Sequence, residues 1–382
     1  MARALYIHWP FCAKKCPYCD FNSHVRDKVD HDLWRASMLA DMRHEAKLAA
    51  DEPLDSVFFG GGTPSLMPPA LVATLLAEAE ALWGFAADIE ITLEANPSSV
   101  EAAKFAGLAA AGVNRVSLGL QSLDDEALRF LGRLHGAAEG LAALETAQAV
   151  FRRVSFDLIY ALPGQSEAHW REQLQRALGF GTDHLSLYQL TIEPGTRFAT
   201  DVRRGQFTPL GGDPAADLFD VTRSLTDAAG MPAYEVSNHA RPGQESRHNL
   251  TYWRYRDYCG IGPGAHGRRG GHATLRHKKP ENWLAAVEAE GHGLSEERAL
   301  PRREQASEAL LMGLRLAEGI APGDLAERFA ISPGQLIDAE RLALYRDLGL
   351  AWSSGERIGV TPAGMPLLDA LLAELVPAEL VA

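Results

Sequence analysis

The sequence predicts an α/β fold, an incomplete parallel (β/α)6 barrel followed by a helical, winged-helix-like C-terminal domain. β-rich runs alternate with amphipathic helical stretches through the first two hundred or so residues, as in βα units. Most of these runs are continuously apolar, which is typical of a sheet covered on both faces. Six such runs can be found, whereas eight close a full barrel. We therefore expect a barrel that stays open on one side.

The predicted elements follow in chain order. The strands cover Leu5–His8, Ser56–Phe59, Ile89–Leu93, Val113–Leu118, Val154–Ile159 and His184–Leu190. Helices between them include Leu33–Ala49, Ala70–Leu82 and Ser166–Leu178. Behind Pro97, the pattern Ser98-x-x-Glu101 forms a capping box, which predicts the start of the helix that follows the third strand.

The pattern changes near Ala299 to helices with Gly- and Pro-rich ends. A helix is predicted from Ser332-Pro333-Gly334 through Leu348, and a short hairpin from Leu350–Trp352 and Ile358–Val360. This order is typical of a winged helix. The stretch 335–341 mixes acidic residues with a single Arg, so we expect a lid or packing module rather than a DNA reader. We divide the chain into residues 1–230, 231–298 and 299–382.

Composition narrows the class of protein. The 382 residues are 46% hydrophobic and 23% charged, which is ordinary for a globular protein and argues against disorder. The 37 Lys and Arg against 50 Asp and Glu give a net charge of −13, so no nucleic-acid partner is expected. No apolar run reaches the ~20 residues that span a bilayer, and His8 interrupts the N-terminal apolar run too early for a secretory signal. We expect a cytoplasmic protein without an integral membrane segment.

Three of the four cysteines, Cys12, Cys16 and Cys19, form a Cys-x3-Cys-x2-Cys pattern. Three soft thiolates on one short loop can hold a compact iron–sulfur cube, whereas a structural zinc site wants four ligands. A 4Fe-4S cluster held in this way keeps one iron open to another molecule. The alternative, reduced cysteines packed at a loop, requires the spacing to be accidental. Cys259 stands apart and is interpreted as a buried thiol.

Polar and glycine-containing motifs follow the C-terminal ends of the predicted strands, where parallel α/β folds place their chemistry. The first is Phe59-Gly60-Gly61-Gly62-Thr63-Pro64, whose glycines allow the backbone to approach a ligand closely. Later strands and loops supply the side chains of Glu94, Gln121, Arg133 and Asp157. Each alone is more typical of a cap or surface ion pair, and only their combination indicates a site.

The motif Tyr6-x-His8-x-Pro10-Phe11-Cys12-x3-Cys16-x-Tyr18-Cys19 resembles the radical S-adenosylmethionine (SAM) superfamily, in the branch of oxygen-independent coproporphyrinogen III oxidase and its relatives. The resemblance implies a barrel of the radical SAM type and a 4Fe-4S cluster. It also implies that the methionyl group of SAM chelates the open iron, that an electron donor exists, and that reductive cleavage can release a 5′-deoxyadenosyl radical. By the same resemblance, the SAM pocket is lined by Tyr6, Gly61, Gly62, Thr63, Glu94, Gln121, Arg133 and Asp157.

Two departures favour one branch of this family. Phe21 stands where the oxidases carry a fourth cysteine, and the motif His248-Asn249-x-x-Tyr252-Trp253 resembles the signature of the haem chaperone branch. That branch implies haem as the bound molecule and a haem-acceptor protein as partner. Imidazole is a common haem ligand and aromatic rings offer flat faces to a macrocycle. We therefore predict that His248 is the axial ligand and that Tyr252 and Trp253 contact the porphyrin.

Three functions remain open. The first is a haem chaperone with a cluster and exchangeable SAM, and the second is an oxygen-independent coproporphyrinogen III oxidase that decarboxylates propionates through a radical. The third is a winged-helix DNA-binding regulator, which the acidic charge disfavours. A basic run containing Arg268 and Arg269 adds the hypothesis that these side chains receive haem propionates.

Overall fold

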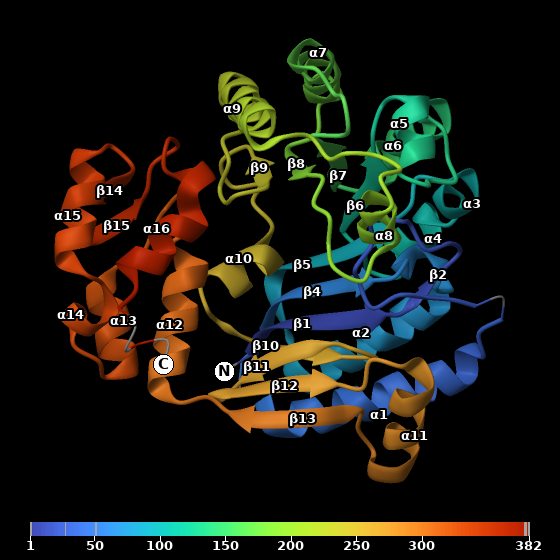
Figure 1. The fold of residues 1–382 in the computed structure, drawn as a ribbon. Coiled ribbons are helices and arrows are strands. Elements are labelled where there is room, and N and C mark those ends of the chain that lie inside the picture. Colours follow the sequence, from blue (N-terminus) through green and yellow to red (C-terminus); the bar gives the residue numbers. More distant parts are fainter. Residues whose placement is uncertain (1, 27, 50–51, 378–379, 381–382) are drawn as a thin grey trace.

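The structure is a computed structural model that describes the whole chain apart from residues 1, 27, 50–51, 378–379 and 381–382. A mixed sheet of eleven strands runs through the described residues, in the order β13-β12-β11-β10-β1-β4-β5-β6-β7-β8-β9. It curves around the middle of the molecule, and the C-terminal helices stand beside it (Figure 1). No described helix has the length and apolar character needed to cross a membrane.

The six predicted strands form the parallel centre of this sheet and lie side by side in chain order. They are β1 (Ala2–Trp9), β4 (Leu54–Gly61), β5 (Phe85–Ala95), β6 (Arg115–Gln121), β7 (Arg153–Tyr160) and β8 (His184–Gln189). Adjacent strands pair in parallel, with Ile7 opposite Phe59 and Phe59 opposite Leu93. The predicted fold class is confirmed by this arrangement.

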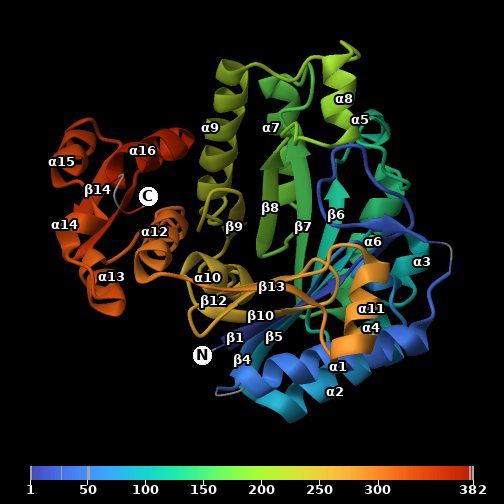
Figure 2. The same ribbon diagram turned by 60° about the horizontal axis from the view of Figure 1, so that its bottom comes forward.

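The sheet extends at both edges beyond the predicted strands. On one side β10 (Asp257–Ile261) pairs in parallel with β1, and β11 (His266–Arg269), β12 (His272–Arg276) and β13 (Leu294–Ala299) continue it antiparallel (Figure 2). On the other side the short antiparallel strand β9 (Asn238–Ala240) pairs with β8. These strands are short or polar, so their sequences lack the apolar run that marks the central strands.

The helices that follow the strands mostly cover one face of the sheet with apolar side chains. They are α1 (His31–Ala49), α2 (Pro69–Trp83), α3 (Ser99–Ala102), α4 (Phe105–Ala110), α5 (Asp125–Phe130), α6 (Ala137–Val150), α7 (Glu167–Leu178), α8 (Arg197–Arg203), α9 (Gly212–Ala228) and α11 (Pro280–Glu290). Of these, α5 and α8 contribute instead to a separate small apolar cluster. On α2, buried Leu71, Leu75 and Ala79 recur at helical spacing and face the main core. The predicted cap of α3 is confirmed, because the Ser98 side chain accepts a hydrogen bond from the Glu101 backbone N–H.

The opposite face of the central strands is polar, unlike the sequence prediction of strands that are apolar on both faces. Along β5, Ile91 and Leu93 belong to the apolar core, whereas Glu90 and Thr92 are buried polar residues. Arg115 on β6 is also buried. The strand period of two sends alternate side chains to opposite faces, so the inside of the partial barrel is lined by polar groups.

The C-terminal region has a second apolar core of its own. It contains α12 (Arg302–Gly313), α13 (Pro322–Phe329), α14 (Pro333–Leu336), α15 (Ala339–Asp347), the hairpin β14 (Ala351–Ser354) and β15 (Arg357–Val360), the 3-10 turn η2 (Met365–Leu367) and α16 (Leu368–Leu375). The single helix predicted from Ser332 through Leu348 is instead two helices. Ile337 is extended, and the Asp338 side chain caps α15 by accepting from the backbone N–H groups of Glu340 and Arg341.

Candidate functional site

Cys12 ends the two-residue strand β2 (Phe11–Cys12), and Cys16 and Cys19 lie on the loop that leads from it to the two-residue strand β3 (His24–Val25). All three are partly exposed. The loop is closed at its base, where the His24 N–H donates to the Pro10 carbonyl at 2.7 Å. Two sulfurs accept hydrogen bonds from distant elements, Cys12 from the Thr63 hydroxyl and Cys16 from Arg133, each at 3.5 Å. The loop is therefore tied to the ends of the central strands.

A small hollow of about 140 Å³, hereafter the small hollow, opens between this loop and the strand ends. Seven of the eight residues predicted to line a SAM pocket lie on its wall: Gly61, Gly62, Thr63, Glu94, Gln121, Arg133 and Asp157. The three cysteines line it as well. Tyr6 does not line it; its hydroxyl is hydrogen-bonded to His8 on the same strand, at 3.0 Å.

The glycine-rich loop at the end of β4 packs directly against the cysteine loop. Its backbone N–H groups at Gly62 and Thr63 donate to the carbonyls of Trp9 and Phe11, at 2.7 and 2.8 Å. Gly61 has φ of +111°, and a Cβ there would lie 2.5 Å from the ring of His8. A Cβ on Gly62 would lie 2.7 Å from the Phe11 carbonyl oxygen. Only glycine fits this close approach of two backbones.

Two carboxyl groups share the floor of the small hollow. Burial, with a smaller contribution from the nearby Asp157, raises the pKa of Glu94 to about 8. Burial also raises the pKa of Asp157 to about 6, although the Ser186 and Ser117 hydroxyls partly offset the shift. The Glu94 carboxylate accepts one hydrogen bond, from the Gly61 N–H at 3.2 Å. A cation placed here would stabilise the ionised form of both groups.

Arg133 joins three parts of the site. Its guanidinium donates to the Asn96 side chain at 2.6 Å and to the Gly119 carbonyl at 2.8 Å, besides its contact with Cys16. Asn96 in turn donates to the Thr63 hydroxyl at 3.1 Å. Sequence reasoning missed Asn96, although it stands two residues beyond Glu94 at the same strand end.

The donor set fits an iron–sulfur cube better than a single metal ion. No three His, Cys, Asp or Glu side chains of the described residues are arranged to hold one ion. Three thiolates that each bind a different iron need not converge on one point. The glycine-rich loop packs closely beside them, because a side chain at Gly61 or Gly62 would collide with His8 or with the Phe11 backbone. The site thus combines three soft ligands with a backbone-lined wall.

A second hollow of about 920 Å³, the large hollow, adjoins the first. It lies between the strand ends of β7 and β8, helix α9 and the segment Met365–Ala370 of the C-terminal region. Five residues line both hollows: Tyr18, Phe21, Glu94, Gln121 and Asp157. A ligand bound in the large hollow would therefore lie next to a ligand bound in the small hollow.

Comparisons with known proteins agree with this geometry. Residues 6–177 match the family model of the Radical SAM superfamily, and residues 300–367 match the HemN C-terminal domain. The mitochondrial radical S-adenosyl methionine domain-containing protein 1 of Mus musculus is 41% identical over 98% of this chain and 87% of its own length. Heme chaperone HemW of Escherichia coli is 44% identical over 69% of this chain and 70% of its length, and that of Bacillus subtilis is 31% identical over 95% and 96%. The chain belongs to the HemW branch of the radical SAM superfamily.

The solved structures place this HemW-family chain in the same fold as a radical SAM enzyme. Coproporphyrinogen III oxidase (HemN) of Escherichia coli superposes with a TM-score of 0.82 over 97% of this chain and 89% of its own, at 23% identity. At that identity the likeness shows the fold alone. The radical SAM domain implies a 4Fe-4S cluster and SAM as the resident cofactors.

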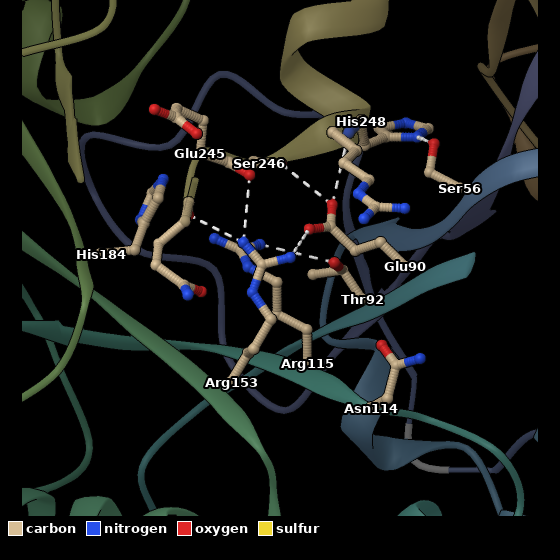
Figure 3. Close-up of polar contacts among 12 residues, drawn as sticks. Ser56, Glu90, Thr92, Asn114, Arg115, Arg153, His184, Glu245, Ser246 and His248 are labelled. Carbon is tan, nitrogen blue, oxygen red and sulfur yellow. Dashed lines mark hydrogen bonds and ion pairs between the residues drawn. The ribbon is translucent and has the colours of Figure 1, made fainter. Parts of the chain in front are cut away.

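The H-N-x-x-Y-W motif of this HemW-family protein lies on α10 (Arg247–Trp253). This helix packs against β4 and β5, where it contacts Ser56 and Glu90. The His248 imidazole is buried, with Nδ1 hydrogen-bonded to the Ser56 hydroxyl at 3.0 Å (Figure 3). Its Nε2 is hydrogen-bonded to the Tyr252 hydroxyl. Burial, with nearby Arg115, lowers the pKa of His248 to about 3, so the ring is neutral. His248 and Tyr252 line neither hollow, and Trp253 points instead toward Arg315.

An ion pair between the partly exposed Arg153 and the buried Glu90 fixes the start of α10. Glu90 on β5 pairs with Arg153 on β7 at 2.5 Å and accepts hydrogen bonds from the Ser246 hydroxyl and the His248 N–H (Figure 3). Arg153 also donates to the carbonyls of Gln244 and Glu245. The His248 side chain is thus held inside the polar interior, away from the small hollow. The small hollow lies at the carboxyl ends of the central strands.

The basic run on β11 and β12 has a structural explanation. Arg269 pairs with Glu45 at 2.7 Å and with Glu297 at 2.9 Å. The guanidinium of Arg268 lies 3.5 Å from the centre of the Tyr255 ring. Neither arginine lines the small or the large hollow, and the contacts above explain both side chains without a ligand. The buried thiol predicted at Cys259 is confirmed.

Proposed function

We propose that this protein is a haem chaperone that binds haem and passes it to an acceptor protein, with a 4Fe-4S cluster and SAM in its partial barrel. The observation that carries the proposal is the match, over nearly the whole chain, to proteins named Heme chaperone HemW. The H-N-x-x-Y-W motif and the exposed Phe21 in place of a fourth cysteine support the same branch.

In this proposal Cys12, Cys16 and Cys19 hold the cluster, which supplies one-electron chemistry and an open iron when it is bound. An electron donor then has to reach the loop, whose Lys14 and Lys15 are exposed. The residues of the small hollow bind SAM. The backbone of Gly61 and Gly62 forms the wall that lies closest to the cysteine loop, and Thr63 holds Cys12 in place.

The charges of the small hollow suit a sulfonium compound. SAM carries a positive sulfur and an ammonium group, and burial raises the pKa of both Glu94 and Asp157, although the Arg133 charge partly offsets the shift of Asp157. Binding of such a cation lowers the pKa of each carboxyl and releases protons in the neutral range. Arg133 contacts Cys16 on the cysteine loop and Asn96 after β5, and so fixes the position of the loop relative to the strand.

For haem, we keep His248 as the proposed axial ligand. In the structure both ring nitrogens are engaged, so ligation requires the Nε2 contact with Tyr252 to be exchanged for iron. The helix that carries His248 has seven residues, and its exposed anchor is the ion pair of Arg247 with Asp88. That exposed pair contributes only about 0–1 kcal/mol, but a shift of the helix would also break the buried contact between the His248 N–H and Glu90.

The rival function, oxidative decarboxylation of coproporphyrinogen III, is favoured by one observation. The large hollow adjoins the small one, so a porphyrinogen there would lie next to SAM. Anaerobic incubation of cluster-loaded protein with coproporphyrinogen III, SAM and a reductant separates the two functions. The chaperone proposal expects stoichiometric haem uptake and no protoporphyrinogen, whereas sustained formation of protoporphyrinogen would overturn it.

A further inference from the structure

The surface around the cysteine loop is basic, although the whole chain has a net charge of −13. Lys14 and Lys15 are both exposed on this loop. Asp20 is the one acidic residue in the segment 12–24. The charge beside the three thiolates therefore has the opposite sign to the charge of the protein as a whole.

A second basic segment lies against the cysteine loop. Lys278 and Lys279 are exposed on the connection between β12 and α11. The Asn22 side-chain amide donates to the Lys278 carbonyl at 2.9 Å, across 256 positions of the sequence. Burial lowers the pKa of His24 and the nearby charge of Lys15 adds to this shift, although a hydrogen bond to the Lys278 backbone opposes it. The two segments thus form one surface, hereafter the basic patch: Lys14, Lys15, Lys278 and Lys279.

Exposed apolar side chains lie beside the basic patch. Val25 is opposite Cys12 in the pairing of β3 with β2, and it is 45% exposed. Leu134 is 69% exposed and directly follows Arg133, whose guanidinium contacts Cys16 at 3.5 Å. Apolar contacts next to a charged rim are the usual composition of a protein–protein interface. The surface over the cysteine loop therefore has both components.

We propose that the basic patch and these apolar neighbours form the docking surface for a small acidic protein that carries one electron. This inference rests on the 4Fe-4S cluster of the proposed function and names the class of its electron donor. The docked protein loses one electron, and the cluster on the three partly exposed cysteines gains it. The patch keeps an excess of positive charge, because Asp20 stands against four lysines and Arg26 is paired with Glu281. Complementary charges speed the association of transient partners without a large interface.

The wild type provides the first test, with a flavodoxin of strongly negative net charge, reduced to its hydroquinone, as the probe. Two acidic proteins repel each other through their net charges, so added salt would speed their association if the basic patch played no part. We expect the opposite. Raising the ionic strength from about 0.01 M to about 0.1 M shortens the Debye length from about 30 Å to about 10 Å, and it should weaken flavodoxin binding and slow cluster reduction. Tighter binding and faster reduction at the higher ionic strength would overturn the proposal.

Charge reversal gives the second test, on anaerobic, cluster-loaded full-length protein. The double variant Lys278→Glu/Lys279→Glu changes residues that line neither hollow. The Kd for flavodoxin should rise about tenfold or more, whereas reduction of the cluster by reduced methyl viologen, a small cation, should not slow. Lys47→Glu/Arg346→Glu makes the same change in net charge at exposed residues of α1 and α15 and should bind flavodoxin like the wild type. Equal weakening in both double variants would overturn the docking surface.

The apolar part is tested by Leu134→Asn, which should weaken flavodoxin binding at high ionic strength as well, because salt does not screen apolar contacts. Leu348→Asn, at a leucine that is 60% exposed in the C-terminal region, is the matched control and should have no effect. Equal binding by both leucine variants and by Lys278→Glu/Lys279→Glu would overturn the proposal.

Haem uptake separates this proposal from the function on which it rests. Normal haem uptake together with a failed salt test would overturn the docking surface alone. Failure of the wild type to hold a cluster or to take up haem would overturn the proposed function. Self-association of the wild type that Lys278→Glu/Lys279→Glu abolishes would overturn the electron donor as the occupant and assign the basic patch to a second copy of this acidic chain.

Discussion

The guanidinium of Arg133 lies 3.5 Å from the sulfur of Cys16, although 117 positions separate the two residues in the sequence. The same side chain donates to Asn96 and to the Gly119 carbonyl, so it connects the cysteine loop with the ends of β5 and β6. The guanidinium donates a charge-assisted hydrogen bond to this sulfur. The cluster ligand and the strand ends are thus held as one unit.

We predict that Arg133→Met makes the cluster labile. Without the guanidinium, Cys16 loses its cation and Asn96 loses a hydrogen bond of 2.6 Å. Iron and sulfide content after exposure to a chelator should fall faster than in the wild type, and SAM affinity should fall by about tenfold or more, as expected for lost hydrogen bonds to charged groups. Arg129→Met, an exposed arginine of α5, is the control. Equal iron retention in both variants would contradict the role of Arg133.

SAM affinity should rise with pH between about 6 and 8. The pKa values of Asp157 and Glu94 are raised to about 6 and about 8, so both carboxyls gain their negative charge over this interval. A cationic ligand therefore binds more tightly as pH rises, and it releases protons when it binds. Calorimetry in buffers of different ionisation enthalpy measures both effects. Glu94→Gln should remove the upper part of the pH dependence, and an unchanged profile in that variant would refute the assignment.

The same shifts give the apoprotein the opposite pH dependence. A carboxyl whose pKa is raised by folding stabilises the folded state while it is protonated, and this contribution is lost as pH rises through the folded pKa. The free energy of unfolding of the cofactor-free protein should therefore decrease between about pH 4.5 and pH 8. Urea titrations at several pH values measure it. In Glu94→Gln the decrease should be smaller, and an equal decrease would show that other groups cause it.

Gly62→Ala should disrupt the wall of the small hollow. The added Cβ would lie 2.7 Å from the Phe11 carbonyl oxygen, so the glycine-rich loop and the cysteine loop must move apart. We expect a loss of about 1–3 kcal/mol in the free energy of unfolding, together with weaker SAM binding. Gly323→Ala on α13 is a matched control, since a Cβ there meets open space. Wild-type SAM affinity in Gly62→Ala would mean that the loop adapts without cost.

The His248–Tyr252 contact gives a prediction for haem. Tyr252→Phe leaves Nε2 of His248 without its partner, so this variant should retain a histidine-ligated haem spectrum and bind haem at least as tightly. His248→Ala should lose that spectrum. His169→Ala, an exposed histidine of α7, controls for adventitious ligation. An unaltered haem spectrum in His248→Ala would remove His248 as the axial ligand.

Arg276→Met should strongly destabilise the fold without affecting the cofactor residues. Arg276 is fully buried and pairs with Asp41 at 3.2 Å and with Glu45 at 2.7 Å. Its removal leaves carboxylates buried with too few partners, which costs about 3–5 kcal/mol. Arg298→Met, which breaks an exposed pair with Glu304, should cost about 1 kcal/mol or less. Denaturant unfolding gives both values, and similar losses for the two variants would argue against the buried network.

Much of the fold was predictable because it is encoded locally. The apolar runs of β1, β4 and β5, the cap at Ser98 and the glycine-rich loop after β4 are each readable within a few neighbouring residues. The edge strands β10 to β13 were not predicted. Their order depends on pairing with β1, and β13 is largely exposed and polar, so no local apolar pattern marks it.

The candidate site was predictable in its residues more than in its arrangement. Seven of the expected residues meet at the small hollow because parallel strands bring their carboxyl ends to one edge. Tyr6 does not line the hollow, and Arg315 was not anticipated at all. No short motif surrounds Arg315, and its position at the large hollow becomes visible only when the neighbouring elements are in place.

The sequence by itself determined the order of the βα units, the three-thiolate loop and the family to which the chain belongs, because strand period, turn residues and ligand spacing are local properties. Only the tertiary structure decided that both nitrogens of His248 are engaged, that Arg268 and Arg269 are held within the protein, and that Arg315 faces a large hollow. These facts depend on contacts between residues far apart in the chain. Which polar groups find a partner is fixed when the barrel and the C-terminal region pack together.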